Sequence, residues 1–270
     1  MKLLFSESKS DYAHYIFPYA IWAIPEEGES AGDFFLQGFL PSSREMDRFY
    51  LCRNVRVDLR RHRPSSENRR ILRKGEDIQA TLVARASFDY SAERRQFYKT
   101  YADIKFGKDI MTLERLDALF KGTITSHLLV FTDLKSGKEV GTITLFMEGD
   151  LLAYYYYAFY DLNYYSRNLG MFMMTSAVEF FKQRGCAFLY LGSCYKQNAL
   201  YKTQFAGVEF FNGVHWSEDM AELKYLIQRD SGEVPQHLLE SEEYRKLFYQ
   251  GDLAVAAEAS EFRVRLNRKV

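Results

Sequence analysis

The sequence has few cysteines and no long apolar run. Its three cysteines, Cys52, Cys186 and Cys194, are too few for a disulfide framework, and none forms a Cys-x-x-Cys pair. The first twelve residues contain an apolar run of only three, and the longest apolar-aromatic stretch, residues 151–160, has the length of a strand. The sequence therefore predicts neither a signal peptide nor a membrane span, and we expect a cytoplasmic protein.

The chain also lacks net charge, because 36 Lys and Arg balance 36 Asp and Glu. This balance excludes a bulk polycation but permits a local basic face. Residues 53–74 hold nine basic and two acidic side chains, whereas residues 217–244 hold two basic and eight acidic ones. Guanidinium groups bind phosphate oxygens in bidentate fashion, so the basic run favours phosphate contacts. The alternative is a solvated face that pairs with the acidic C-terminal segment.

Aromatic residues are abundant, with 20 Tyr and 22 Phe in 270 residues. Tyr and Phe at this density pack large cores and also build stacking platforms for nucleic-acid bases. The length predicts one elaborated domain or two small ones.

Hydrophobic periodicity predicts an α+β fold. Residues 50–59 alternate between apolar and charged side chains, as in a half-buried strand. Ser91 and Thr112 have the character of helix N-caps, and Gly170 opens a longer helix. After residue 91 the predicted order is helix, helix, three strands, helix and strand, which resembles the GNAT acyltransferase core, a mixed sheet with flanking helices. We expect an N-terminal β-rich transferase lobe (1–88), a GNAT-like domain (89–216) and a helical C-terminal extension (217–270).

Three segments have the character of a site. The Arg167-x-x-Gly170 spacing leads into a helix start, whose N–H groups can face an anion; an ordinary strand-to-helix turn is the alternative. Residues 154–157 are four consecutive tyrosines, and alternation places Tyr154 and Tyr156 on one face of a strand. Residues 187–191 form a buried strand that runs into a polar loop ending at Tyr201 and Lys202, the place where functional groups gather in α/β folds.

Several separate motifs, taken in order, carry a family resemblance over residues 10–216. They are residues 52–59 and 63–73 in the first half, and residues 156–161, 167–170, 189–192, 201–205 and Trp216 in the second. Together they resemble the aminoacyl-tRNA–protein transferases of the N-degron pathway, the arginyl-type family that also contains bacterial leucyl-tRNA–protein transferases. Family members with an iron–sulfur site carry further cysteines, whereas Cys52 stands alone here. We therefore expect no metal. The resemblance also implies no cofactor, because the ester of an aminoacyl-tRNA is already activated.

The resemblance implies a reaction, two macromolecular partners and a set of roles. The α-amine of a protein or peptide N-terminus attacks the ester of an aminoacyl-tRNA, which performs protein arginylation when arginine is the donor. Asp161 would orient the amine, Lys202 would hold the oxyanion or the acceptor carboxylate, and Ser193 would donate a hydrogen bond. The residues implied in binding tRNA or substrate are Arg56, Arg63, Arg69, Arg70, Tyr156, Tyr160, Arg167, Gly170 and Tyr201. We expect a monomer.

Two other functions remain open on the sequence. A coenzyme A-dependent N-acetyltransferase could use the same fold, although Phe172 stands where its pyrophosphate pattern requires a small residue. A non-catalytic module that binds tRNA or degrons is the second. The loop between Gly192 and Tyr201 is shorter than in the family, and residues 40–43 lack its basic side chains. These departures leave the donor, arginine or leucine, and the acceptor N-terminus open.

Overall fold

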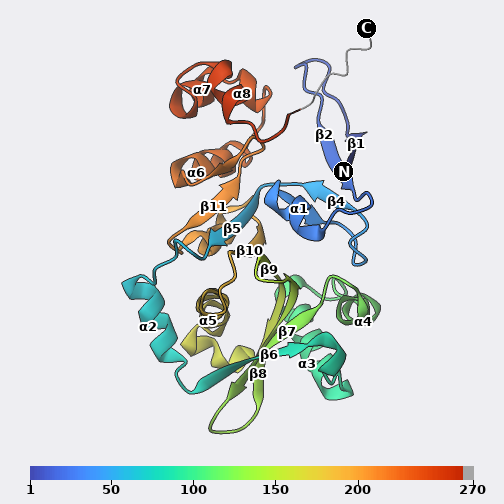
Figure 1. Cartoon of the computed structure of the whole chain (residues 1–270), viewed down its shortest axis with the longest axis vertical. Helices are drawn as coiled ribbons and strands as arrows, with labels where there is room; N and C mark the ends of the chain where they lie inside the picture. The colour runs from blue at the N-terminus through green and yellow to red at the C-terminus, as the bar shows by residue number, and fades with distance from the viewer. Residues whose placement is uncertain (264–270) are drawn as a thin grey trace.

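The structure is a computed structural model that describes residues 1–263, apart from the side chains of residues 165–167. Within this part of the chain the strands form an eight-stranded and a four-stranded sheet (Figure 1). The large sheet has the order β12-β11-β5-β10-β9-β8-β7-β6. Neighbouring strands are antiparallel except for β9 and β10, which run parallel. In chain order its strands are β5 (Asn54–Asp58), β6 (Ile78–Ala84), β7 (His127–Asp133), β8 (Glu139–Glu148), β9 (Leu152–Tyr160), β10 (Phe188–Ser193), β11 (Val208–Phe211) and β12 (Trp216–Ser217).

Helices cover both faces of the large sheet. On one face lie α5 (Leu169–Gln183), which is the crossover between the parallel strands β9 and β10, and α2 (Ser66–Lys74). On the other face lie α3 (Ala92–Phe106) and α4 (Leu113–Lys121). Alternation along β7 shows the two layers, because Leu129 and Phe131 join the core beneath α5 while Leu128 and Val130 join the core beneath α3 and α4.

The small sheet has the order β1-β2-β4-β3 and packs on the large one. Its strands are β1 (Lys2–Glu7), β2 (Tyr19–Ile24), β3 (Phe39–Pro41) and β4 (Phe49–Leu51), and α1 (Ala31–Leu36) lies between β2 and β3 in the chain. The ring of Phe35 in α1 lies 5.2 Å from Tyr154 and 4.9 Å from Tyr190, centroid to centroid. This aromatic contact joins the small sheet to β9 and β10.

The described chain after β12 is helical, with α6 (Met220–Arg229), η4 (Leu238–Glu240), α7 (Glu242–Phe248) and α8 (Leu253–Ala259). The 3-10 segment η3 (Gln197–Thr203) lies earlier, between β10 and β11. Two further 3-10 segments, η1 (Arg85–Ser87) and η2 (Leu162–Arg167), precede α3 and α5. Leu223 and Tyr244 bring α6 and α7 into the same core as α5. None of the described helices is long and apolar enough to cross a membrane.

The predicted α+β class, with a mixed sheet and flanking helices, is confirmed, as is the element order after residue 91. The Ser91 and Thr112 hydroxyls accept hydrogen bonds from the N–H groups of Arg94 and Arg115, so both predicted caps form. The half-buried strand predicted over residues 50–59 is wrong in two respects. It is divided between β4 of the small sheet and β5 of the large one, and β5 is not half-buried. All five residues of β5 are buried, because β5 lies between β10 and β11. Since β5 and β6 belong to the large sheet, residues 1–88 do not all lie in one N-terminal sheet, and the domain boundaries stay predictions.

Candidate functional site

A pocket opens where the two parallel strands part. β9 pairs with β10 over three residues only, Leu152 to Tyr154 opposite Phe188 to Tyr190, but remains paired with β8 as far as Tyr160. The crevice beyond the carboxyl ends of diverging strands is a common ligand position in α/β folds. Here it has a volume of about 430 Å³.

Aromatic side chains dominate this cavity, which we call the tyrosine pocket. Its walls come from α3, β9, the start of α5, β10 and η3, elements far apart in the sequence. The lining residues are Tyr101, Phe106, Tyr155, Tyr156, Tyr157, Ala158, Tyr160, Asn168, Gly170, Met171, Met174, Leu191, Tyr201 and Lys202. The structure thus brings together five of the residues predicted from the sequence: Tyr156, Tyr160, Gly170, Tyr201 and Lys202.

A β-bulge explains why consecutive tyrosines line the pocket. Thr144 of β8 lies opposite Tyr157, but Leu145 lies opposite Tyr155, so Tyr156 is an extra residue on β9. The Thr144 hydroxyl accepts a hydrogen bond of 3.1 Å from the Tyr157 N–H and so supports the irregular backbone. Bulges next to functional sites redirect side chains. The predicted alternation holds for Tyr154 and Tyr156, whose ring centroids lie 5.3 Å apart, but fails at Tyr157, which packs with Tyr156 in the core beneath α3 and α4.

The start of α5 is in close contact with a tyrosine hydroxyl. A Cβ atom at Gly170 would lie only 2.8 Å from the Tyr160 hydroxyl oxygen, so a glycine allows this approach. The Tyr160 ring packs against Tyr101, with 4.7 Å between the ring centroids. The helix start adds N–H groups and a positive dipole end to this corner. The predicted partner Arg167 has a side chain that lies outside the described residues.

Lys202 is a half-buried amine in this pocket. Its Nζ donates a hydrogen bond of 2.9 Å to the Ser193 backbone carbonyl, and among the described residues no carboxylate forms an ion pair with it. Burial lowers the pKa of Lys202. The nearby thiols do not offset this, because burial raises the pKa of Cys52 to about 12 and also raises the pKa of Cys194, so both are neutral. A lowered pKa leaves a larger fraction of this amine neutral near neutral pH than in an ordinary lysine, and only the neutral form can accept a proton.

Ser193 and Asp161 lie outside the lining of the tyrosine pocket. Ser193 contacts Lys202 through its carbonyl, which accepts, and the predicted donating role of its hydroxyl stays a prediction. The Asp161 carboxylate accepts hydrogen bonds from the N–H and the side-chain amide of Asn163, at 2.8 and 2.7 Å. It lines an adjoining cavity of about 330 Å³, and both cavities share Tyr101 and Tyr160 as a wall.

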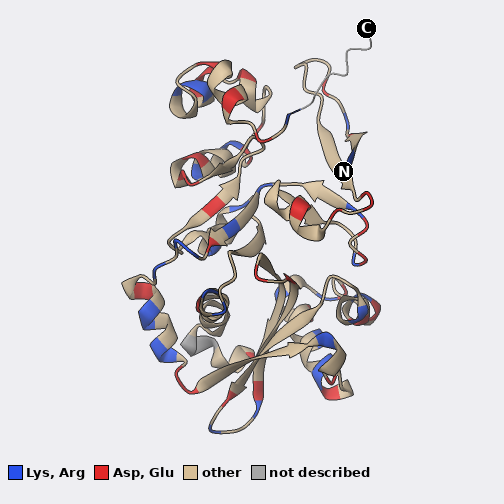
Figure 2. Cartoon of the chain, in the orientation of Figure 1, with Lys and Arg blue, Asp and Glu red and all other residues tan. Residues whose placement is uncertain are grey.

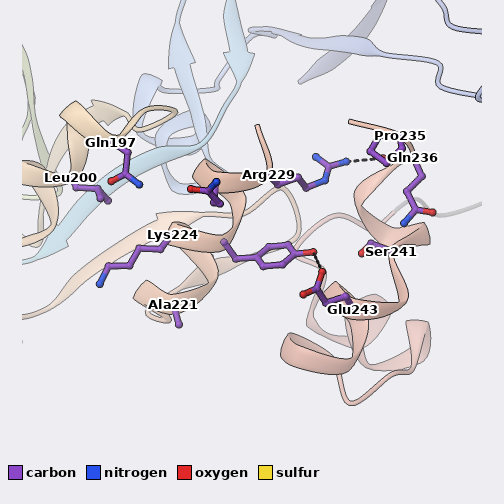
Figure 3. A pocket seen from close by; sticks show the side chains of 11 residues that line it. Gln197, Leu200, Ala221, Lys224, Arg229, Pro235, Gln236, Ser241 and Glu243 are labelled. Carbon is purple, nitrogen blue, oxygen red and sulfur yellow. Dashed lines mark hydrogen bonds between the residues drawn. The ribbon is translucent and has the colours of Figure 1, made fainter. Parts of the chain in front are cut away.

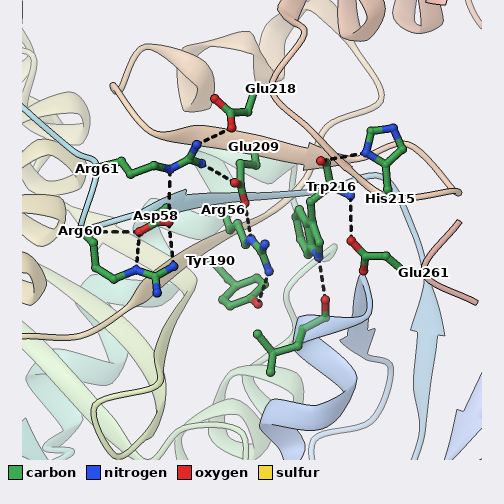
Figure 4. Close-up of polar contacts among 11 residues, drawn as sticks. Arg56, Asp58, Arg60, Arg61, Tyr190, Glu209, His215, Trp216, Glu218 and Glu261 are labelled. Atoms are coloured by element: carbon green, nitrogen blue, oxygen red, sulfur yellow. Dashed lines mark hydrogen bonds and ion pairs between the residues drawn. The ribbon is translucent and has the colours of Figure 1, made fainter. Parts of the chain in front are cut away.

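The structure contradicts the prediction for Arg56, which is only 8% exposed. Figure 4 shows the polar contacts that surround it. Its Nε donates to Glu209 at 2.7 Å and its Nη1 donates to the Tyr190 hydroxyl at 3.2 Å. The guanidinium also lies 3.7 Å from the centre of the Trp216 ring. Because Arg56 lies on a central strand with all these partners, it is a structural residue and does not share a surface with the other three arginines.

Arg63, Arg69 and Arg70 are exposed on α2 and the loop before it. Figure 2 shows basic residues along α2. Gly75, which ends α2, is in such close contact with Phe172 that a Cβ there would lie 2.3 Å from the ring. Phe172 is in the first turn of α5, so the basic helix ends beside the helix whose start lines the tyrosine pocket. The alternative interpretation of the basic run holds for two other arginines. Arg53 pairs with Asp230 at 2.8 Å and Arg61 pairs with Glu218, both partners in the acidic segment.

Within the described part of the chain, no cluster of three or more His, Cys, Asp or Glu is placed to hold a metal ion.

No family model matches the chain. It is 30% identical over 176 residues to an aspartate/glutamate leucyltransferase of Marinobacter nauticus, and the aligned region covers 62% of this chain and 70% of the relative. The chain belongs to the aspartate/glutamate leucyltransferase family. It is also 25% identical to the leucyltransferase of a Ruegeria species, over 62% of this chain and 61% of the relative, so it spans less than two thirds of that protein. For the leucyltransferase of Saccharophagus degradans the identity is 24%, over 61% of this chain and 70% of the relative.

Solved structures show only a weak likeness to this leucyltransferase-family chain. The C-terminal DUF2156 domain of a protein from Agrobacterium fabrum named as a lysylphosphatidylglycerol synthetase matches 53% of this chain and 46% of its own, with a TM-score of 0.43 and 15% identity. The L-PGS of Bacillus licheniformis matches 52% of this chain and 44% of its own, with a TM-score of 0.38 and 15% identity. Likenesses of this size carry no argument. The sequence relatives support a transferase of the acyltransferase class.

Sequence reasoning missed part of the pocket wall of this family member. Tyr101 and Phe106 lie on α3, where aromatic residues at helical spacing indicate a core, and Met174 and Leu191 have the same apolar character. Asn168 is distinguished only by its backbone conformation, which the sequence does not show. It adopts the left-handed region, with φ of 53°, at the N-cap of α5. No motif in the sequence distinguishes these residues from packed ones.

Proposed function

We propose that this chain transfers a leucyl group from leucyl-tRNA to the α-amine of a protein or peptide that begins with Asp or Glu. The proposal follows the names of its relatives. The observation that carries it is the Lys202 amine, with its lowered pKa, inside an aromatic pocket that borders the start of α5.

The pocket lining favours leucine over arginine as the donor. The described lining residues include no carboxylate, and Phe106, Met171, Met174 and Leu191 provide apolar surface. A leucyl side chain would bury its methyl groups there, whereas a guanidinium would lose its hydration without gaining a counter-ion.

The reaction is an aminolysis in which this chain supplies positions and a proton acceptor. The nitrogen of the acceptor amine forms a bond with the carbonyl carbon of the ester, and the bond from that carbon to the ribose oxygen breaks. The amine gives up one proton, which Lys202 accepts in its neutral form and returns to the departing ribose oxygen. The Tyr160 hydroxyl and the N–H groups at the start of α5 stabilise the negative charge that develops on the carbonyl oxygen. The ester is already activated, so positioning supplies most of the rate gain.

The tRNA end approaches from the side of α2. Arg63, Arg69 and Arg70 contact phosphates of the acceptor stem, and the start of α5 receives a phosphate near the terminal adenosine. Tyr156 and the exposed Tyr201 offer rings on which the adenine stacks.

Asp161 holds the incoming ammonium group of the acceptor until that group loses its first proton to water; the second proton, lost during the attack, is the one that Lys202 accepts. The carboxylate lies in the cavity that adjoins the tyrosine pocket, and only the Tyr101 and Tyr160 side chains separate the two. From there the neutral amine passes the Tyr101 and Tyr160 side chains into the tyrosine pocket and reaches the ester.

A transfer assay tests the proposal. The protein is incubated with radiolabelled leucyl-tRNA or arginyl-tRNA and with peptides that begin with Asp, Glu, Lys or Ala. We expect label in the Asp and Glu peptides with leucyl-tRNA only. Acetylation of these peptides by acetyl-coenzyme A, without transfer from either tRNA, would replace the proposal by the acetyltransferase alternative.

A further inference from the structure

A second cavity lies on the opposite side of η3 from the tyrosine pocket. It has a volume of about 800 Å³ and runs between η3, α6 and the start of α7 (Figure 3). We call it the α6–α7 groove; its lining residues are Gln197, Leu200, Ala221, Lys224, Tyr225, Gln228, Arg229, Pro235, Gln236, Ser241 and Glu243. Leu200 lines this groove while the next two residues, Tyr201 and Lys202, line the tyrosine pocket. One short helical segment therefore forms a wall of both cavities.

Two hydrogen bonds connect the two sides of the groove. Arg229 at the end of α6 donates to the Gln236 carbonyl at 2.7 Å, and the Tyr225 hydroxyl of α6 donates to Glu243 of α7 at 3.1 Å. Both contacts cross from α6 to the segment that follows it, so the groove is formed before a ligand arrives (Figure 3).

The lining has the chemistry of a polypeptide site. Gln197, Gln228 and Gln236 present side-chain amides, each with a donor and an acceptor, which is the pairing that main-chain peptide groups require. Tyr225 and Pro235 add apolar surface for side chains. The lining carries the cations Lys224 and Arg229 beside Glu243, but Arg229 already donates to the Gln236 carbonyl and pairs with Asp230, which disfavours a polyphosphate or an RNA backbone as the occupant.

We infer that the α6–α7 groove binds the acceptor polypeptide downstream of its N-terminal residue, while the tRNA occupies the α2 side. This inference rests on the proposed function, because it takes the acceptor amine to lie by the tyrosine pocket. A helix with its side chains is about 10 Å across, and an extended chain advances about 3.3 Å per residue. The third to fifth acceptor residues therefore reach the groove after the chain has crossed η3.

A peptide-length series tests the inference with the full chain. Acceptor peptides of two and of ten residues that begin with Asp are compared in wild type, in Ala221→Trp, which fills the groove, and in Ala257→Trp. The last variant is a matched control, because Ala257 is also an exposed helical alanine and does not line the groove. We expect the KM of the ten-residue peptide to be at least tenfold lower than that of the dipeptide in wild type and in Ala257→Trp. In Ala221→Trp this gain disappears, while kcat and the dipeptide KM stay within twofold.

A wild-type KM that does not depend on peptide length, or a gain that survives in Ala221→Trp, would overturn the inference. Direct binding separates it from the proposed function. The fluorescence anisotropy of a labelled ten-residue Asp peptide is measured without tRNA, and we expect Ala221→Trp to weaken its Kd at least tenfold relative to Ala257→Trp. Weaker peptide binding by Ala221→Trp, with no leucyl transfer by wild type, would support the groove as a peptide site and contradict the proposed function. Equal Kd values in the two variants, with normal leucyl transfer, would support the proposed function and overturn the inference about the groove. If Ala221→Trp weakened the binding of an RNA oligonucleotide and not of the peptide, the groove would be an RNA site and its assignment to the acceptor polypeptide would be wrong.

Discussion

Replacing Gly170 by alanine places a methyl group against the Tyr160 hydroxyl. The added Cβ would lie 2.8 Å from that oxygen, whereas ordinary contact begins at 3.4 Å, so the hydroxyl must move by about 0.6 Å. A misplacement of about 1 Å in a reacting group costs up to about 100-fold in rate. We therefore expect kcat for leucyl transfer to fall about tenfold. Stability should not fall, because alanine in place of glycine favours a helix by up to about 1 kcal/mol.

Single-turnover transfer and thermal unfolding measure the two effects separately. Gly232→Ala is the matched control, because no atom lies within 4 Å of the added Cβ there. Unchanged kcat in Gly170→Ala would refute the idea that the contact between Tyr160 and α5 positions the reacting groups. A fall in Tm of more than about 5 °C would show that the variant loses its packing instead.

Further variants separate structural from functional groups. Arg56→Met should lower the free energy of unfolding in urea by about 3 kcal/mol. This is the lower end for a broken buried ion pair, because Glu209 keeps its ion pair with Arg61. Stability equal to wild type would contradict the structural role of Arg56. Arg69→Glu should leave the urea midpoint unchanged and weaken tRNA binding, with a smaller salt dependence of the Kd; equal binding would remove α2 from the tRNA path. Lys202→Met should lower kcat at least 100-fold, because the proton acceptor is lost. It should also raise Tm, because the burial that lowers the pKa of an amine destabilises its charged form in the folded state. A lower Tm would contradict the buried-amine account. The three buried thiols should resist iodoacetamide at pH 8 in the native protein, as mass spectrometry would show, and fast labelling would contradict their raised pKa values.

The sequence could predict the elements whose signals are local. The Ser91 and Thr112 caps and the apolar run at β10 depend on neighbouring residues, so helix starts and a buried strand followed from them. The position of β5 could not be predicted in this way. Its insertion between β10 and β11 depends on pairing with residues at least 130 positions away, and this pairing buries Arg56.

The candidate site, too, could be predicted only where its signals lie in neighbouring residues, and not where they depend on long-range pairing or burial. Tyr160, Gly170 and Lys202 were found because they lie in motifs with a family resemblance, and the structure brings all three to one pocket. The bulge at Tyr156 was not predictable, because it arises from a register shift against β8. The lowered pKa of Lys202 also needs three dimensions, since it comes from burial that a sequence does not display.

One measurement tests the central claim most directly: the pH dependence of leucyl transfer from leucyl-tRNA to an Asp peptide, in wild type and in Lys202→Arg. Because the neutral Lys202 amine accepts the proton, we expect the wild-type rate to rise with pH through a pKa below the ordinary lysine value and then level off. Arginine stays protonated, so Lys202→Arg should lose at least 100-fold in kcat at neutral pH and react only as the acceptor amine itself deprotonates, near pH 8. The same rate and the same pH profile in both proteins would contradict the account.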